Sequence, residues 1–365
     1  MTRRQLWRNL FGHLDLPLLA GMGLLMAASL LTLYSASDHN LERVMSQGLN
    51  ILVAFICLWI VANLPLHYLM RAAVPIYVLG MLLLIGVALF GEISHGARRW
   101  LNIGVATIQP SELMKIGVPM MMAWYFEKYE ASLTLKNYTI AALLLLLPVG
   151  LIARQPDLGT ALLISASGFY VLFLAGLSWR VMGGLFVAAI ASAPLMWSML
   201  HDYQRHRIEM LFDPSQDALG KGYHTIQGMI AVGSGGILGK GFLNGTQTHL
   251  DFLPERTTDF IFAVYSEEFG LVGNLILLTM YCFVIARGFV ITANASTYFT
   301  RLMAGSITLT FATYAFVNMG MVSGILPIVG VPLPLFSYGG TSMLTLLLGF
   351  GMLMSIQTHK KLVKS

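Results

Sequence analysis

Charged residues and cysteines are scarce in this sequence. Only 11% of its 365 residues are charged and 56% are hydrophobic, whereas soluble globular proteins carry about 25% charged residues. This composition excludes an ordinary soluble domain and predicts a membrane protein with several spans. The two cysteines, Cys57 and Cys282, both lie inside apolar runs, where we expect them to pack, so no disulfide framework is indicated.

Several motifs of soluble enzymes are also missing. The sequence has no HExxH, no CxxC pair and no GxSxG, which argues against zinc and serine hydrolases. Its GSGGILGKG stretch lacks the GKS or GKT of a Walker loop. The net charge of +5 does not indicate nucleic acid, because basic residues in a membrane protein mostly report topology. The histidines between residues 200 and 258 lack metal-ligand spacing: His201, His206, His224 and His249.

Long apolar runs dominate the sequence instead. About ten of them approach the roughly 20 residues that a membrane-spanning helix needs. A membrane β-barrel would show alternating segments of about ten residues, and runs such as IAALLLLLPVGLIA do not alternate. The predicted fold class is therefore an all-α polytopic membrane protein, with residues 1–365 as a single integral membrane domain. The expected spans lie near residues 16–36, 47–63, 71–90, 111–127, 138–153, 159–176, 180–199, 259–287, 301–324 and 340–357.

Basic residues orient these spans. With the N-terminus in the cytoplasm, most Lys and Arg of the short connections fall on the cytoplasmic side, so both termini are predicted to be cytoplasmic. The long connection 200–258 then lies outside, and loops of that length are usually functional. Its residues 201–214 are predicted to form an amphipathic piece in the membrane interface. Seven glycines between residues 228 and 245 predict tight folding or close approach to a ligand.

The QPSELMK stretch, residues 109–115, carries charge into an expected span. A charge in the membrane costs about 2.5–3.5 kcal/mol, so Glu112 and Lys115 need a reason to be there. They share one helix face, and a self-satisfied ion pair is one interpretation. Arg98 and Arg99 precede them at the same outer end, which favours a site for a pyrophosphate and a sugar.

Two further carboxylate groups lie at outer ends. In RQPDLGT, Asp157 is either a plain helix N-cap or a site residue. In FLPERTTDFIF, residues 252–262, Glu255 and Asp259 are four apart and flank Arg256, which is more than helix capping explains. Deeper in the same span, Glu267 and Glu268 need partners or protonation, and structural bonds to other spans are the favoured interpretation.

The stretch between the last two expected spans is SGILPIVGVPLPLFSYGGTS, residues 323–342. It holds Pro327, Pro332 and Pro334 followed by a double glycine, so it cannot be regular helix throughout. Irregular backbone at membrane depth occurs only beside protein or a wet cavity. A re-entrant segment that lines a cavity is therefore expected.

These stretches together resemble the SEDS (shape, elongation, division and sporulation) family. The resemblance runs from about residue 94 to the C-terminus, on SHGARRWLNIG, QPSELMK, RQPDLGT, GLSWR, HDYQRHR, GKGFLNGTQTHLDFLPERTTDFIFAVYSEEFGLVG and MVSGILPIVGVPLPLFSYGGTS. It implies a peptidoglycan glycosyltransferase of about ten spans in the cell inner membrane, which polymerises lipid II for elongation and rod shape. It also implies partnership with a class B penicillin-binding protein and other cell-elongation proteins. The family's essential aspartate matches Asp259, and its other functional positions match Glu112, Lys115 and Asp157.

A mechanism follows from this resemblance as a hypothesis. Asp259 would act as base on the acceptor sugar hydroxyl, with inversion at the donor's anomeric carbon. Glu112 would position Lys115 or a sugar hydroxyl, and Glu255 would bind sugar or tune Asp259. The remaining predicted substrate-binding residues, several of them candidates for the pyrophosphate, are Lys115, Asp157, Arg98, Arg99, Lys240 and Ser337.

Two points stay open in the sequence. No cofactor is certain, and no spacing specifies a divalent ion such as Mg²⁺ or Mn²⁺ on the pyrophosphate. A lipid II flippase is the alternative function, because intramembrane acids and a broken segment also suit a translocation path. A scaffold without chemistry is disfavoured, because it would need no acids at depth.

Overall fold

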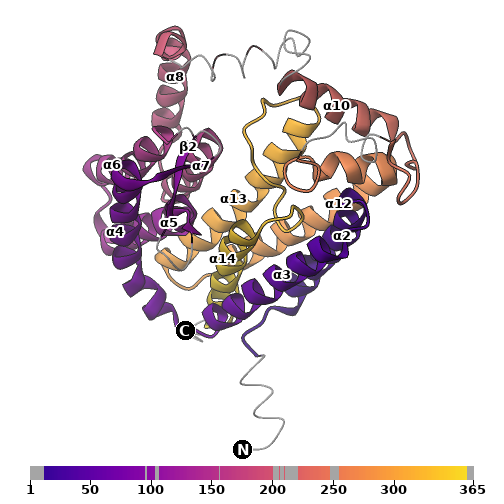
Figure 1. Ribbon diagram of the computed structural model, residues 1–365. Coiled ribbons are helices and arrows are strands. Elements are labelled where there is room, and N and C mark those ends of the chain that lie inside the picture. The colour runs from indigo at the N-terminus through magenta and orange to yellow at the C-terminus, as the bar shows by residue number, and fades with distance from the viewer. Residues whose placement is uncertain are drawn as a thin grey trace, which may run out of the picture.

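The computed structural model describes residues 12–94, 97–102, 107–155, 157–199, 205, 209, 221–246 and 255–359. The N-terminal arginines and nearly all of the predicted amphipathic piece 201–214 lie outside these residues. Within them the chain is a helical bundle (Figure 1), which confirms the predicted membrane fold class. The helices are α2 Leu16–Ala36, α3 Leu41–Ala62, α4 Leu66–Phe90, α5 Pro110–Lys128, α6 Leu135–Ala153, α7 Leu158–Leu174, α8 Trp179–Met199, α10 Lys221–Ser234, α12 Ile261–Ala293, α13 Tyr298–Val322 and α14 Gly340–Thr358, with a 3₁₀ turn at Glu130–Ser132.

Each predicted span coincides with one of these helices, and α10 belongs to the long connection 200–258. Seven helices among the described residues are long and apolar enough to cross a membrane. Helix α7, with 17 residues, helix α8 and the more polar helix α5 are the other helices that coincide with predicted spans. The multi-pass architecture therefore stands, while the number of spans and their orientation stay predictions.

A small antiparallel sheet departs from the all-α expectation. Strands β1 Glu92–Ser94, β2 Ala97–Asn102 and β3 Thr107–Ile108 pair in the order β1-β2-β3 between α4 and α5. The strands give the backbone of this connection hydrogen-bond partners that a bare loop would lack. Strand β2 carries Arg98 and Arg99 in this way to the N-terminal end of α5.

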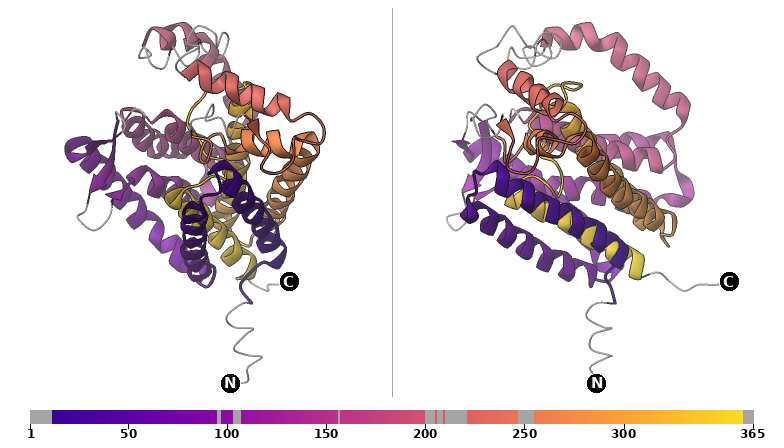
Figure 2. Two further views of the ribbon diagram at one scale, coloured as in Figure 1. Left: turned by 45° about the vertical axis from the view of Figure 1, so that its right-hand side comes forward. Right: turned by 90° about the vertical axis from the view of Figure 1, so that its right-hand side faces the viewer.

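Helix α13 is the centre of the bundle. It packs against α5 and α7 on one side, and against α12 and α14 on the other. Figure 1 shows α4 to α7 grouped to one side of α13, and α2, α3 and α12 to the other. Helix α8 stands away from the bundle in the turned view of Figure 2, and its apolar side chains are exposed, as at Val187 and Ile190.

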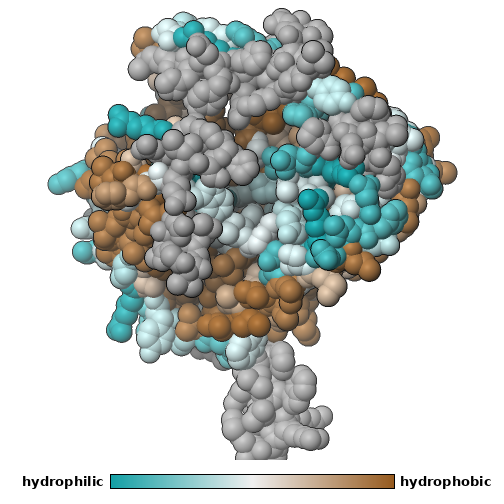
Figure 3. All heavy atoms as spheres, viewed as in Figure 1, coloured by the Kyte–Doolittle hydropathy of each residue, from teal (hydrophilic) through white to brown (hydrophobic). Residues whose placement is uncertain are grey.

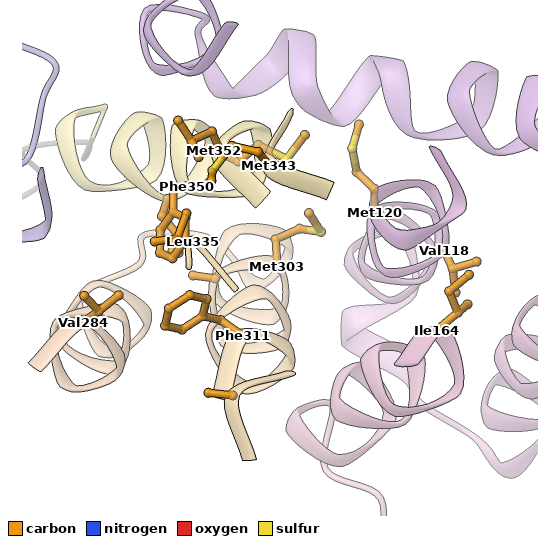
Figure 4. Close-up of a cluster of buried hydrophobic side chains, with 14 of the residues drawn as sticks. Val118, Met120, Ile164, Val284, Met303, Phe311, Leu335, Met343, Phe350 and Met352 are labelled. Carbon is orange, nitrogen blue, oxygen red and sulfur yellow. The ribbon is translucent and has the colours of Figure 1, made fainter. Parts of the chain in front are cut away.

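The apolar core runs through the bundle and includes the place where α13 meets α14 and the irregular segment 323–339. Figure 4 shows Leu335, Phe350 and Phe311 lying together. The rings of Phe311 and Phe350 pack edge to face with centroids 5.1 Å apart, an arrangement that aromatic pairs favour. Burial of Leu335 and Phe336 confirms that this segment enters the bundle without helical structure.

Helix α12 is broken at Gly270, where φ is 62° and ψ is −160°. The glycine-rich segment 235–241 fills the break and exchanges hydrogen bonds with it. Backbone groups freed by the break are satisfied in both directions, as a membrane helix requires. The bonds run from Leu271 N to Gly236 O (2.9 Å), Val272 N to Ile237 O (3.1 Å), Lys240 N to Glu267 O (3.0 Å) and Gly241 N to Glu268 O (3.0 Å). Of the two alternatives predicted from the glycines, the structure shows tight folding of the backbone, while close approach to a ligand stays a prediction.

Candidate active site

Asp259 lies in a turn, residues 255–260, immediately before α12 at the end predicted to be outside. Three successive carbonyls of this turn accept hydrogen bonds from the C-terminal part of the chain. The donors are Tyr338 N to Thr257 O (2.9 Å), Ser337 Oγ to Thr258 O (2.6 Å) and Asn318 Nδ2 to Asp259 O (2.8 Å). We call this set of three bonds the carbonyl clamp. It holds the backbone of Asp259 rigidly against α13 and segment 323–339.

The carboxylate of Asp259 is largely enclosed. A Cβ added to Gly330 would lie 3.5 Å from Asp259 Oδ2, so the segment 323–339 forms one wall. Burial, and then the charge of Glu255, raise the pKa of Asp259 to about 6. Glu255 itself is exposed, has φ 54° and accepts a hydrogen bond from Thr258 Oγ1 at 2.8 Å. A carboxylate with a pKa near 6 suits a general base.

Glu112 and Lys115 form a half-buried ion pair in the first turns of α5. Lys115 Nζ lies 2.5 Å from Glu112 Oε1, and Thr345 Oγ1 of α14 donates to Glu112 Oε2 at 2.9 Å. Lys115 Nζ also lies 5.4 Å from the ring centroid of Tyr314 on α13, a cation–π contact. The self-satisfied pair is therefore present, but it also joins three helices. A small cavity of about 50 Å³ lies beside Lys115, Tyr314 and Thr345.

Asp157 is the N-cap of α7, as its capping interpretation predicts. Its Oδ1 accepts from Thr160 N at 3.2 Å, and its Oδ2 accepts from Gln109 Nε2 at 3.1 Å. The second bond ties the start of α7 to the start of α5. A Cβ added to Gly159 would lie 2.5 Å from Val329 O, so the first turn of α7 also packs on segment 323–339.

Helix α13 joins these groups into one region. Tyr314 contacts Lys115, and Asn318, four residues further along, bonds Asp259 O. Four residues of helix correspond to about 6 Å along the axis. Asp259, Lys115 and Asp157 are thus gathered around one end of α13, as the sequence predicts. Figure 3 shows a hollow in the surface over this part of the molecule, with hydrophilic residues on its right.

Other predicted site residues are engaged differently. Ser337 uses its hydroxyl on Thr258 O and accepts from Leu333 N at 2.8 Å, so it supports the turn. Arg99 is half-buried in β2, and the side chain of Arg98 lies outside the described residues. Arg256 forms an ion pair with Asp38 in the turn after α2.

Lys240, predicted to hold the pyrophosphate, belongs to a different cluster. Its Nζ lies 2.6 Å from Glu267 Oε1 and 2.7 Å from Thr246 Oγ1. Glu267 is fully buried and also accepts from Thr246 N at 2.9 Å. The neighbouring Glu268 bonds Ser35 of α2. The predicted bond to another span is therefore present for Glu268, whereas the partners of Glu267 lie in the connection 200–258 and not in another span.

Replacing Lys240 with methionine is expected to lower the free energy of unfolding by about 3 kcal/mol, because Glu267 keeps a buried charge without its cation. The measurement is thermal unfolding of the purified protein in detergent. The matched control is Lys136→Met, at an exposed lysine, with an expected change within about 0.5 kcal/mol. A weakened affinity for lipid II without loss of stability would instead place Lys240 in the substrate site.

Sequence reasoning missed two residues of this region, Tyr314 and Asn318. With Ser306 and Thr310 they form a polar stripe at four-residue spacing on an otherwise apolar span. Such spacing places side chains on one helix face, and polar groups inside a membrane are commonly functional. The sequence shows this periodicity, but it does not show that the stripe contacts Lys115 and the Asp259 turn.

The fold and the site define a class: a multi-pass membrane protein with carboxylates and a lysine collected at one end of its bundle. The comparison with protein families identifies the family within this class. Residues 11–362 match the FtsW/RodA/SpoVE family, described as cell cycle protein. The chain belongs to this family, which is the SEDS family that its motifs resemble.

Similar proteins and solved structures support the assignment to this family. The chain is 49% identical over 352 residues to peptidoglycan glycosyltransferase MrdB of Escherichia coli (strain K12), covering 96% of this chain and 95% of that protein. It is 36% identical over 357 residues to MrdB of Helicobacter pylori, covering 95% and 90%. Among solved structures, one that reports polymerization and crosslinking by a peptidoglycan synthase complex matches with TM-score 0.81, 33% identity and coverage of 94% and 97%. The rod shape determining protein RodA of Thermus thermophilus matches with TM-score 0.71, 29% identity and coverage of 94% and 96%.

Proposed function

We infer that this chain is a peptidoglycan glycosyltransferase, and we propose that Asp259 is its general base. The observation that carries the proposal is the position of the half-buried Asp259 carboxylate, which lies beside Gly330 and is held by the carbonyl clamp at the same end of α13 as Lys115. A base needs a pKa near the working pH. A lipid pyrophosphate is already a good leaving group, so it needs a cation more than an acid.

The proposed step is an inverting displacement between two lipid-linked glycans. The 4-hydroxyl oxygen of the acceptor's GlcNAc bonds to the anomeric carbon of the donor strand's terminal MurNAc. The bond from that carbon to the pyrophosphate oxygen breaks, and undecaprenyl pyrophosphate leaves with the bonding electrons. The hydroxyl proton passes to Asp259. Lys115 stabilises the pyrophosphate, while Glu112, held by Thr345, keeps the Lys115 ammonium in place.

A resident metal ion has no clear holder in the described residues. They contain no group of three or more His, Cys, Asp or Glu side chains placed to bind one. Both carboxylate oxygens of Asp157 accept hydrogen bonds, from Thr160 and Gln109, and both oxygens of Glu112 accept from Lys115 and Thr345. No step is therefore assigned to Mg²⁺ or Mn²⁺.

The setting of the enzyme follows from its class. We propose that the whole chain is one integral domain of the cell inner membrane, with both termini cytoplasmic and the Asp259 end outside. Its partner is a class B penicillin-binding protein that crosslinks the strands, within the group of cell-elongation proteins. The chemistry takes place where the lipid-linked substrate presents its sugars. The apolar surfaces of the spans surround the lipid tails of that substrate.

The flippase alternative needs a polar path across the bundle. In the described residues the polar stripe of α13 runs from Asn318 to Ser306, whose hydroxyl bonds Ser167 O at 2.8 Å. The next position at four-residue spacing, Leu302, is buried and apolar. The stripe thus ends within α13 and does not cross the bundle, which favours chemistry at the Asn318 end.

The decisive experiment supplies lipid II to the purified protein in detergent, with and without its penicillin-binding partner. We expect glycan strands to lengthen, because polymerisation needs no second compartment. Protein that forms no strands under any of these conditions, yet moves lipid II between leaflets in vesicles, would establish the flippase instead.

The activity is expected to fall in acid. Asp259 works as a base only when ionised, and its pKa of about 6 lies above the ordinary value of 3.8. The value of kcat/KM should therefore be constant above about pH 7 and drop roughly tenfold per pH unit below pH 6. The measurement is the pH profile of strand formation. A profile that stays flat down to pH 4.5 would contradict a base with this pKa.

A further inference from the structure

Asn318 is a fully buried amide on a membrane helix. None of its surface is exposed, and an amide in such a place is costly unless it is hydrogen-bonded. Its Nδ2 donates to Asp259 O at 2.8 Å and to Val331 O at 2.7 Å. Both hydrogens of the NH₂ group are thereby used. Because both partners are carbonyl oxygens, which only accept, the orientation of the amide is determined.

The two carbonyls bound by Asn318 frame the proposed base. One belongs to Asp259 itself, and the other follows Gly330, whose α-carbon faces Asp259 Oδ2. Asn318 therefore ties the backbone that carries the carboxylate to the wall that encloses it. The other bonds of the carbonyl clamp hold Thr257 and Thr258, so Asn318 provides the one that acts on Asp259 directly.

The same helix face also sets the distance to the cation. Tyr314 lies one turn before Asn318 and carries the ring beside Lys115 Nζ. One helix thus contacts both the turn that carries the base and the lysine, and its two contacting residues lie about 6 Å apart along the axis. Displacement of a reacting group by about 1 Å costs about 10²-fold in rate. A fixed spacing between base and cation is therefore part of what the reaction needs.

We propose that Asn318 is a positioning residue of the glycosyl transfer, which fixes the Asp259 carboxylate relative to Gly330 and to Lys115. The proposal rests on the proposed role of Asp259 as base. Asn318 does not touch the reacting atoms and exchanges no proton. It acts by holding the Asp259 turn closed and partly dry.

The first test replaces Asn318 with leucine, which matches its shape and removes both donors. The expected result is a kcat about 10²-fold lower with KM within twofold, measured as lipid II polymerisation per folded protein. Water should also reach Asp259, so the acid limb of the pH profile should move to lower pH. Thr308→Val on the same helix is the matched control, since its buried hydroxyl bonds Ala304 O within α13, and it should keep the wild-type rate and profile.

A second pair of variants guards against poor folding. Asn318→Gln and Asn318→Met have the same length and similar volume, but only glutamine has amide donors. We expect the glutamine variant to exceed the methionine variant in kcat by about tenfold, with equal thermal stability. Equal kcat in this pair, or an unshifted pH profile in the leucine variant, would overturn the positioning role.

Failure of this inference is distinguishable from failure of the proposed function. An Asp259→Asn protein that still polymerises at the wild-type rate removes the base, whatever Asn318 does. An inactive Asp259→Asn protein together with a fully active Asn318→Leu protein leaves the base in place and removes only the positioning role.

Discussion

Asp259→Asn is expected to lower the rate of glycan polymerisation by about 10²–10⁴-fold, the range that a lost general base costs. Asparagine has the same shape, and the carbonyl clamp binds only backbone oxygens of the turn. The fold and the substrate affinity should therefore survive while proton abstraction is lost. The measurement is strand formation from lipid II by the purified variant, with thermal unfolding recorded on the same sample.

Glu130→Gln is the matched control for this prediction. It makes the same carboxylate-to-amide change at an exposed residue of the 3₁₀ turn Glu130–Ser132, which lies outside the Asp259 turn and the helix ends that form the proposed site. Its rate should stay within about twofold of wild type, in line with the small effect of exposed substitutions. Polymer forming at a near wild-type rate in the Asp259→Asn protein would show that another group takes the proton.

Gly239→Ala is expected to give the largest loss of stability, about 4 kcal/mol or more. Gly239 has φ 78°, and an added Cβ would lie 2.0 Å from Glu268 O. The methyl group would push segment 235–241 away from the break in α12. The hydrogen bonds exchanged around Gly270 would then be lost in a part of the chain that water reaches poorly. Thermal unfolding and the yield of folded protein from membranes measure the effect.

Gly236→Ala separates this clash from ordinary backbone strain. Gly236 also has a left-handed φ, 57°, but an added Cβ meets nothing within 4 Å. Only the cost of placing alanine at such a φ should appear, about 1–2 kcal/mol. If both variants lost the same stability, the close packing of segment 235–241 on α12 would not matter.

Much of the helical architecture could be predicted from hydrophobicity alone. Unbroken apolar runs such as 16–36 coincide with helix α2 because membrane helices satisfy their own backbone. The break at Gly270 could not be predicted in this way. It depends on segment 235–241 packing against α12, which is a tertiary contact that no local sequence pattern predicts. The strand pairs of 92–108 were missed because strands of three, six and two residues show too little alternation.

The candidate site was predictable where acids and bases stand at helix ends. Asp259, Glu112 and Lys115 are visible as charges that a membrane penalises, and the structure gathers them around α13. The partner of Lys240 was not visible, because Glu267 is 27 residues away in the chain. Asn318 could not be predicted as a site residue for another reason. An uncharged amide in an apolar run carries no charge that the membrane penalises, and its partners Asp259 O and Val331 O appear only in the structure.

The broken helix α12 has a consequence for how the chain is made. An ordinary span completes its own hydrogen bonds and can enter the bilayer alone, but α12 borrows four of its bonds from residues 236, 237, 240 and 241. Those residues precede α12 in the chain, so they are already synthesised when it emerges. We therefore expect insertion of this helix to be coupled to docking of segment 235–241, because neither satisfies its backbone without the other.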